Sequence, residues 1–156
     1  MNCNISADIE PIMKKAASLL CRRMHSAHEL RNKLIKKFSP EAVNMAINEL
    51  IRLDYLNDAR FASAFAAELQ KKGLGRIMVI NRMMKRGLPL SLCEETVPQE
   101  PKETEIEHAN EFLRTRRKSL ERVVPQNRKD KLFRMLKSRG FSNETIFEIL
   151  DSYFAD

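Results

Sequence analysis

The stretch Phe38-Ser39-Pro40-Glu41-Ala42-Val43, with Ile47 four residues further on, decides the fold class because it occurs in three versions. The others are Leu88-Pro89-Leu90-Ser91-Leu92-Cys93, followed by Val97, and Phe141-Ser142-Asn143-Glu144-Thr145-Ile146, followed by Leu150. Each version places an apolar residue before a capping position, a second one five residues later, and a third one helical turn beyond. In the first and third versions this pattern is typical of a Ser-capped helix start with a hydrophobic staple.

The spacing of these helix starts indicates a repeat. Their first residues are 50 and 53 positions apart, which is too long for one helical hairpin and suits a unit of three helices. The second and third versions follow Lys85-Arg86-Gly87 and Ser138-Arg139-Gly140, where the Gly can take the left-handed conformation after a last helical turn. The first version has Lys37 at that place, so its preceding helix must end in another way, for which Pro40 is a candidate. Chance gives a few such matches in any helical protein, but here the flanking segments repeat as well.

Composition favours helices throughout. The chain has 156 residues, no Trp and two Tyr, and it is rich in the good helix formers Ala, Leu, Met, Glu, Lys and Arg. We therefore predict an all-α protein: an elongated, curved array of three tandem three-helix repeats. No apolar run reaches the length of about 18 residues that suggests a membrane helix, and residues 1–10 lack the layout of a signal peptide. Three scattered cysteines favour reduced thiols in a cytoplasmic protein.

Helix and linker signals divide the chain further. We expect a tail over 1–9, repeats over 10–56, 57–97 and 105–156, and a linker over 98–104 that contains Pro98-Gln99-Glu100-Pro101. Nine helices are expected, over about 10–24, 27–37, 40–53, 58–71, 76–86, 90–97, 104–118, 127–139 and 143–154. Residues 119–126, with Pro125 inside, are predicted to form a longer loop.

Positive charge is segregated along the chain. The net charge is +7, and residues 111–139 hold eleven Lys or Arg against three acids. Residues 14–37 hold eight against one, and residues 76–86 hold four with none. Segregated charge of this kind favours a polyanionic or acidic partner, although basic side chains that only solvate outer helix faces give the same counts. The candidate contact residues are Arg76, Arg82, Lys85, Arg86, Arg114, Arg116, Arg117, Lys118, Arg128, Lys131 and Arg134.

Four segments carry a family resemblance. Ser26-Ala27-His28-Glu29-Leu30-Arg31-Asn32-Lys33-Leu34 resembles a helix opening of the RecX regulatory proteins, whose pattern is Ser, Glu-Leu and then Lys-Leu. Asp54-Tyr55-Leu56-Asn57-Asp58-Ala59-Arg60-Phe61-Ala62 is similar to the family's Gly-Tyr-Leu-Asp-Asp-x-Arg-Phe-Ala signature. Lys72-Gly73-Leu74-Gly75-Arg76-Ile77 with Lys85-Arg86-Gly87-Leu88, and Leu136-Lys137-Ser138-Arg139-Gly140-Phe141 with the ending Phe154-Ala155-Asp156, resemble further elements, the last one typical of proteobacterial members. The match covers about residues 12–156.

The departures from the family pattern are few. Asp54 replaces the usual Gly and Asn57 replaces the first Asp, both with residues that tolerate the required turn and cap. Tyr55 and Phe61 are interpreted as core residues.

The resemblance implies a modulator of the RecA recombinase. In that family, an array of three-helix units lies in the groove of the RecA filament on DNA and hinders ATP hydrolysis, strand exchange, co-protease activity and filament growth. The implied partner is thus the RecA filament on DNA, with DNA phosphates as an additional contact, and the free protein is expected to be a monomer. A plain DNA-binding helical module is the alternative, although Gln126 and Asn127 are the only base-reading residue types at helical spacing on the basic segments.

No residue pattern predicts catalysis. Cys21 and His25 are one helical turn apart, yet no second pair stands near them in sequence to complete a metal site. Gly73-Leu74-Gly75 lacks the Lys-Ser or Lys-Thr of a phosphate loop. We therefore expect a protein that is not an enzyme and needs no cofactor.

Overall fold

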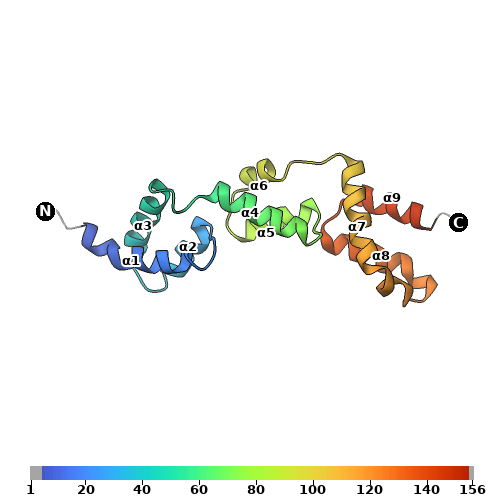
Figure 1. Ribbon diagram of the computed structural model, residues 1–156, viewed down its shortest axis with the longest axis horizontal. Helices are drawn as coiled ribbons and strands as arrows, with labels where there is room; N and C mark the ends of the chain where they lie inside the picture. The colour runs from blue at the N-terminus through green and yellow to red at the C-terminus, as the bar shows by residue number, and fades with distance from the viewer. Residues whose placement is uncertain (1–4, 155–156) are drawn as a thin grey trace.

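The computed structural model describes residues 5–154, with side chains from residue 9 onward. This part of the chain contains helices and no strand, which confirms the all-α class, and the helices follow one another in an elongated arrangement (Figure 1). The nine helices of the described residues are α1 (Ile5–Leu20), α2 (Ala27–Leu34), α3 (Pro40–Arg52), α4 (Asp58–Lys71), α5 (Arg76–Lys85), α6 (Leu90–Thr96), α7 (Lys102–Glu121), α8 (Pro125–Arg139) and α9 (Asn143–Tyr153).

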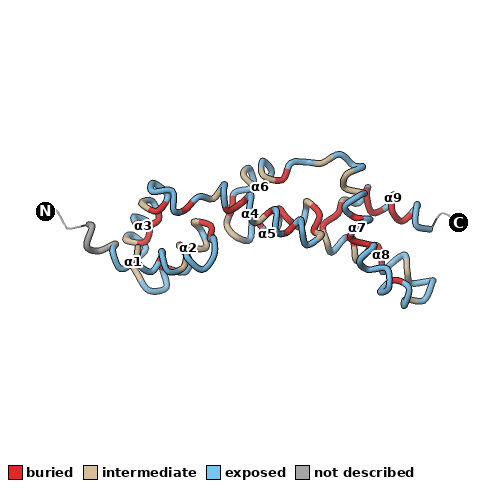
Figure 2. The backbone as a smooth tube through the Cα atoms, in the orientation of Figure 1, coloured by how far each residue is buried: buried red, intermediate tan, exposed pale blue. Residues whose placement is uncertain are grey.

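Three separate hydrophobic cores lie along the array, so buried segments recur over its whole length (Figure 2). The first core joins α1, α2 and α3 with Leu56, the second joins α4, α5 and α6, and the third joins α7, α8 and α9. On this basis we propose residues 10–56, 57–97 and 105–156 as three structural units. They are called the first, second and third unit below.

Side-chain caps explain where several helices begin. Ser26, Ser39 and Ser142 each accept a hydrogen bond from the backbone amide three residues further on, at 3.1, 3.3 and 3.2 Å. Asn57 caps α4 in the same way through the amide of Arg60, at 3.0 Å. These caps satisfy amides that have no partner inside their helix, and they confirm the capping predicted from the sequence.

Two glycines end helices as the sequence predicts. Gly87 and Gly140 have φ of 81° and 86°, the left-handed conformation that terminates a helix after its last turn. Asp54 takes the same conformation with φ of 57° after α3, where the family pattern has Gly. Lys37 does not adopt the left-handed conformation. The helix α2 ends instead in tight turns, in which the amides of Lys37 and Phe38 both donate to Leu34 O.

The structure corrects three predicted helix boundaries. The helix predicted over 10–24 runs from Ile5 to Leu20 and contains Pro11. Residues 1–4 of the predicted tail lie outside the described residues. The predicted long loop over 119–126 is wrong, because buried Leu120 extends the inner stripe of α7. Pro125 occupies the first turn of α8, where its missing N–H costs no helical hydrogen bond.

The prediction that Tyr55 belongs to the core is also wrong, whereas Phe61 is buried as predicted. Asp54 adopts the left-handed conformation after α3, and the amides of Tyr55 and Leu56 both donate to Leu50 O. This turn directs Leu56 into the first core at 2% exposure and leaves Tyr55 on the surface at 68%.

The first and second units meet at the start of α2. Ser26, the cap of α2, donates its hydroxyl proton to the carbonyl oxygen of Arg86 at the end of α5. The guanidinium of Arg86 pairs with Glu29 in the first turn of α2 and lies 5.2 Å from the ring centroid of Phe65. The amide of Ala27 donates to Asp58 at 2.8 Å. We call this set of contacts the first joint.

The second and third units meet in a related way at the start of α5. The amides of Gly75 and Ile77 donate to the carbonyl oxygens of Arg139 and Gly140, at 2.8 and 3.3 Å. Arg139 also donates to Lys72 O at 3.0 Å, and its guanidinium lies 4.6 Å from the ring centroid of Phe112. We call this set of contacts the second joint.

Candidate functional site

A dense concentration of positive charge lies in the hairpin formed by α7 and α8, at one end of the array. Residues 114–131 contain eight Lys or Arg and two acids, a net of +6 within 18 residues, and residues 14–37 of the first unit are similarly basic, with eight against one. The turn of this hairpin spans only residues 122–124. Arg128 stabilises it by donating to Val123 O at 2.9 Å and to Glu121 O at 3.2 Å. The hairpin is therefore the candidate surface for a polyanion.

The basic residues of α7 divide between two sides of the helix. Arg114, Arg117 and Lys118 are spaced i, i+3 and i+4 and are exposed, so they share a face. Arg117 donates to Glu121 at 2.9 Å, a contact between side chains that are 78% and 54% exposed and therefore weakly coupled. Arg116 lies elsewhere, 5.9 Å from the ring centroid of Phe112. The candidate contact face on α7 is thus Arg114, Arg117 and Lys118.

Several of the residues that the sequence singles out are held in contacts within the protein. Arg76 donates to Val97 O at 2.9 Å and joins the start of α5 to the end of α6. Arg86 belongs to the first joint, and Arg128 closes the hairpin turn. Arg134 is exposed and donates to Asp130 O at 3.2 Å within α8. Among the described residues, no ion pair or hydrogen bond engages the side chains of Arg82, Lys85, Arg114, Lys118 and Lys131.

A second candidate surface lies on the outer side of α5. Ile77 and Met84 are 47% and 45% exposed and, with Asn81 between them, follow an i, i+4, i+7 spacing. Lys85 is beside this stripe and Arg82 is further round the helix, both exposed. Exposed apolar side chains with a basic border are typical of a protein-binding face, and Met adapts well to a partner surface. This face belongs to the second unit, and its Ile77 end lies at the second joint, where the amide of Ile77 donates to Gly140 O at the end of α8.

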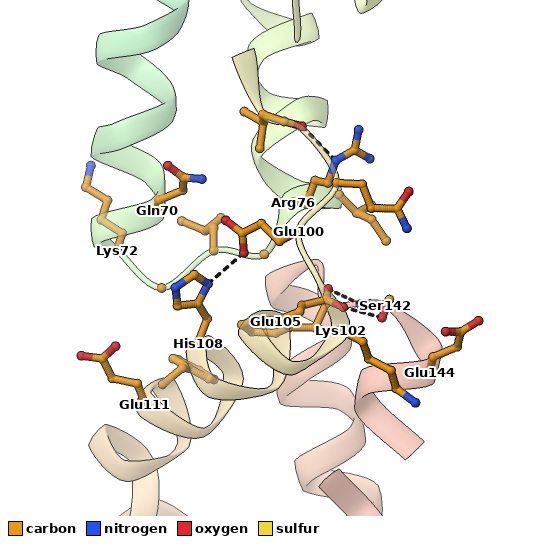
Figure 3. A pocket seen from close by; sticks show the side chains of 18 of the residues that line it. Gln70, Lys72, Arg76, Glu100, Lys102, Glu105, His108, Glu111, Ser142 and Glu144 are labelled. Carbon is orange, nitrogen blue, oxygen red and sulfur yellow. Dashed lines mark hydrogen bonds and ion pairs between the residues drawn. The ribbon is translucent and has the colours of Figure 1, made fainter. Parts of the chain in front are cut away.

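A groove of about 830 Å³ lies where the second and third units meet. Its walls come from the end of α4, the start of α5, the segment before α7, and the starts of α7 and α9 (Figure 3). Basic Lys72, Arg76 and Lys102 line it together with acidic residues, so it has no single charge sign. Sequence reasoning missed this groove because it depends on contacts between distant segments.

Several polar side chains in the groove are already hydrogen-bonded within the protein. Glu105 accepts hydrogen bonds from Ser142 N at 2.9 Å, Ser142 Oγ at 2.6 Å and Thr145 Oγ1 at 2.6 Å. Burial raises the pKa of Glu105, but these three donors lower it more, so the pKa is below its usual value. His108 Nδ1 lies 3.2 Å from a carboxylate oxygen of Glu100 in the same groove (Figure 3). In this arrangement Ser142 and Glu105 stabilise the start of α9.

The described residues contain neither a metal-binding cluster nor a helix able to span a membrane. No group of three or more His, Cys, Asp or Glu side chains is placed to hold a metal ion in this part of the chain. His25 is buried, with Nδ1 2.9 Å from Arg23 O, and does not form a site with Cys21. Within the same residues, no helix has both the length and the apolar character needed to span a membrane.

The fold and charge distribution define a tandem three-helix repeat protein with concentrated basic segments. Comparison with known proteins makes this specific. Residues 13–50 match the first three-helix domain of RecX, and residues 103–150 match its third three-helix domain. The regulatory protein RecX of Chlorobaculum tepidum is 35% identical over 137 residues, which cover 85% of this chain and 82% of that protein. The chain belongs to the RecX family.

Other relatives agree with this assignment. The regulatory protein RecX of Haemophilus ducreyi is 28% identical over 85% of this chain and 86% of its own. The crystal structure of RecX from Lactobacillus salivarius superimposes with a TM-score of 0.79 at 19% identity, over 94% of this chain and 97% of that one. A second crystal structure of a regulatory protein RecX gives a TM-score of 0.81 at 15% identity, over 95% and 73%. These two structures show that the fold is shared.

Proposed function

We propose that this protein binds the RecA filament on DNA and inhibits it, lowering ATP hydrolysis, strand exchange and co-protease activity. Membership of the RecX family is the observation that carries the proposal. The basic α7–α8 hairpin and the apolar–basic face of α5 support it, because they offer two kinds of contact to an assembly made of protein and nucleic acid. Such a partner places the protein in the cytoplasm.

The proposed mechanism needs no catalysis. An elongated protein that contacts neighbouring subunits can hold them in one relative orientation and obstruct the groove that another duplex or a repressor must enter. We propose that α5 contacts the protein part of the filament and that Arg114, Arg117 and Lys118 contact phosphates or acidic side chains. Contacts of the second kind are long-range and screened by salt, so they should contribute both affinity and salt dependence.

The direct test is RecA ATPase activity on single-stranded DNA with and without this protein. We expect inhibition. Inhibition far below one copy per RecA subunit indicates a blocked filament end, and inhibition near stoichiometry indicates a filled groove. Full ATPase activity at a stoichiometric excess, with helicity confirmed by circular dichroism, would contradict the proposal.

A charge variant tests the surface. Replacing Arg114, Arg117 and Lys118 by Gln should weaken binding to the RecA–DNA filament and, if these side chains contact single-stranded phosphates, reduce the slope of log affinity against log salt by about 2. The matched control replaces three basic residues of the first unit, Lys14, Lys15 and Arg22, by Gln. Equal effects of the two triple variants would mean that net charge alone matters.

DNA binding without RecA is the second candidate function, and the net charge of the α7–α8 hairpin is what favours it. Fluorescence anisotropy with labelled single-stranded DNA, bare or coated with RecA, separates the two. We expect the coated DNA to bind more tightly. Equal or tighter binding to bare DNA favours the alternative.

A further inference from the structure

The two joints are built on the same plan. In each, an Arg-Gly pair at the end of one unit's second helix meets the first turn of the preceding unit's second helix: Arg86-Gly87 meets α2, and Arg139-Gly140 meets α5. The last carbonyl groups of one helix thus accept hydrogen bonds from the start of another helix. These bonds satisfy groups that have no partner within their own helix. The negative end of one helix dipole also meets the positive end of another, which further stabilises each joint.

The arginine of each pair ties down the side chains around the joint. The guanidinium of Arg86 pairs with Glu29, whose side chain is only 13% exposed, and covers the ring of Phe65. The guanidinium of Arg139 bonds Lys72 O and covers the ring of Phe112. Each guanidinium therefore combines a polar contact across the joint with a contact to an aromatic ring, which restricts its orientation.

Gly75 allows the closest approach at the second joint. It caps α5 with φ of −72° and ψ of 163°, a conformation that any residue can adopt. A Cβ atom at this position would lie only 2.6 Å from the carbonyl oxygen of Gly140. Since that oxygen belongs to the backbone of another unit, it cannot rotate away. Glycine is thus required at position 75 because it permits the short distance between the two units, and not because of its own backbone conformation.

We propose that the two joints fix the relative orientation of the three units, and that this fixed orientation lets the chain contact several subunits of a helical filament at once. The inference rests on the proposed function for its second half. Rigid connection raises the effective concentration of each unit at its own contact site and avoids an ordering cost on binding. If the three units were joined loosely, the chain would bind the filament more weakly even though every contact residue was still present.

Gly75→Ala tests the proposal, because its added methyl group acts only on the distance between units. Arg139→Met is a second variant that loosens the same joint without adding bulk at the backbone. Ser91→Ala, an exposed substitution on α6, is the control. The first joint is tested by Ser26→Ala against Ser39→Ala: both remove a helix cap, but only Ser26 also bonds the neighbouring unit.

The readouts are small-angle X-ray scattering for orientation, circular dichroism for helix content, and affinity for a RecA filament on single-stranded DNA. We expect joint variants to keep their helix content, to show an altered distance distribution, and to bind at least about tenfold more weakly than the controls. A scattering profile unchanged in both Gly75→Ala and Arg139→Met overturns the structural half of the inference. An altered profile with affinity within about twofold of the controls overturns the link to binding. If the unmodified protein does not bind the filament, the proposed function fails, and the scattering still decides whether the joints fix the orientation.

Discussion

Glu105 on α7 holds the start of α9 through Ser142, whose backbone amide and hydroxyl both donate to the Glu105 carboxylate, at 2.9 and 2.6 Å. Ser142 in turn caps α9, so the carboxylate secures the cap as well as the helix. Thr145 adds a third donor at 2.6 Å. This contact connects the first and last helices of the third unit beside the groove.

We predict that Glu105→Gln lowers the free energy of unfolding by about 1–2 kcal/mol at neutral pH, since hydrogen bonds to a charged acceptor are lost. Because the pKa of Glu105 is lowered in the folded protein, its charge stabilises the fold above the ordinary carboxyl pKa. That stabilisation disappears as the pH falls through the lowered value. Urea denaturation at neutral pH and at about pH 3 should therefore show the variant and the wild type converging on acidification. Glu107→Gln, exposed on the same helix, is the control; a constant gap between Glu105→Gln and wild type would contradict the assignment.

We predict that Arg86 acts in stability and its neighbour Lys85 does not. Arg86→Met removes the ion pair with Glu29 and the contact with Phe65, and should cost about 1–3 kcal/mol in urea denaturation. Lys85→Met, with no such contact, should stay within about 0.5 kcal/mol of wild type. Similar losses for both variants would show that the first joint contributes little.

Leu120 tests the extended end of α7. It is 2% exposed, so Leu120→Ala should lower the free energy of unfolding by about 2–5 kcal/mol. Ser119→Ala, exposed at the adjacent position of the helix, should change it by less than about 0.5 kcal/mol. Thermal denaturation of the two variants decides the point, and a harmless Leu120→Ala would restore the loop that the sequence suggested.

Tyr55, in the turn before α4, and Phe61, on α4, should contribute differently to stability. Phe61→Ala empties part of the second core and should cost about 3–5 kcal/mol. Tyr55→Ala removes a side chain that is 68% exposed and should stay within about 0.5 kcal/mol of wild type. Chemical denaturation followed by circular dichroism measures both, and a large loss for Tyr55→Ala would mean that its ring is packed.

Local signals made much of the fold predictable. Ser39, Ser142 and Gly140 have roles that depend on a few neighbouring residues, and the sequence identified each role correctly. Tyr55 was misjudged because its direction is set by the backbone at Asp54, where one left-handed residue exchanges the inner and outer sides of the chain.

The candidate site was less predictable than the fold. Charge counts cannot separate a basic residue that faces solvent from one that serves the structure. Arg86 and Lys85 are adjacent and equally basic in sequence, yet only Arg86 reaches a carboxylate, which lies 57 positions earlier in the chain. The joints and the groove depend on such distant pairs, and no local pattern reveals them.

The hydrogen bonds of the second joint allow its opening to be followed by hydrogen exchange. Amides in the first turn of a helix normally exchange their hydrogen with water quickly, because no carbonyl group of their own helix protects them. The amides of Gly75 and Ile77 are instead held by Arg139 and Gly140. Their exchange with deuterium therefore measures how often the second and third units part, at two known atoms and without any label attached to the protein.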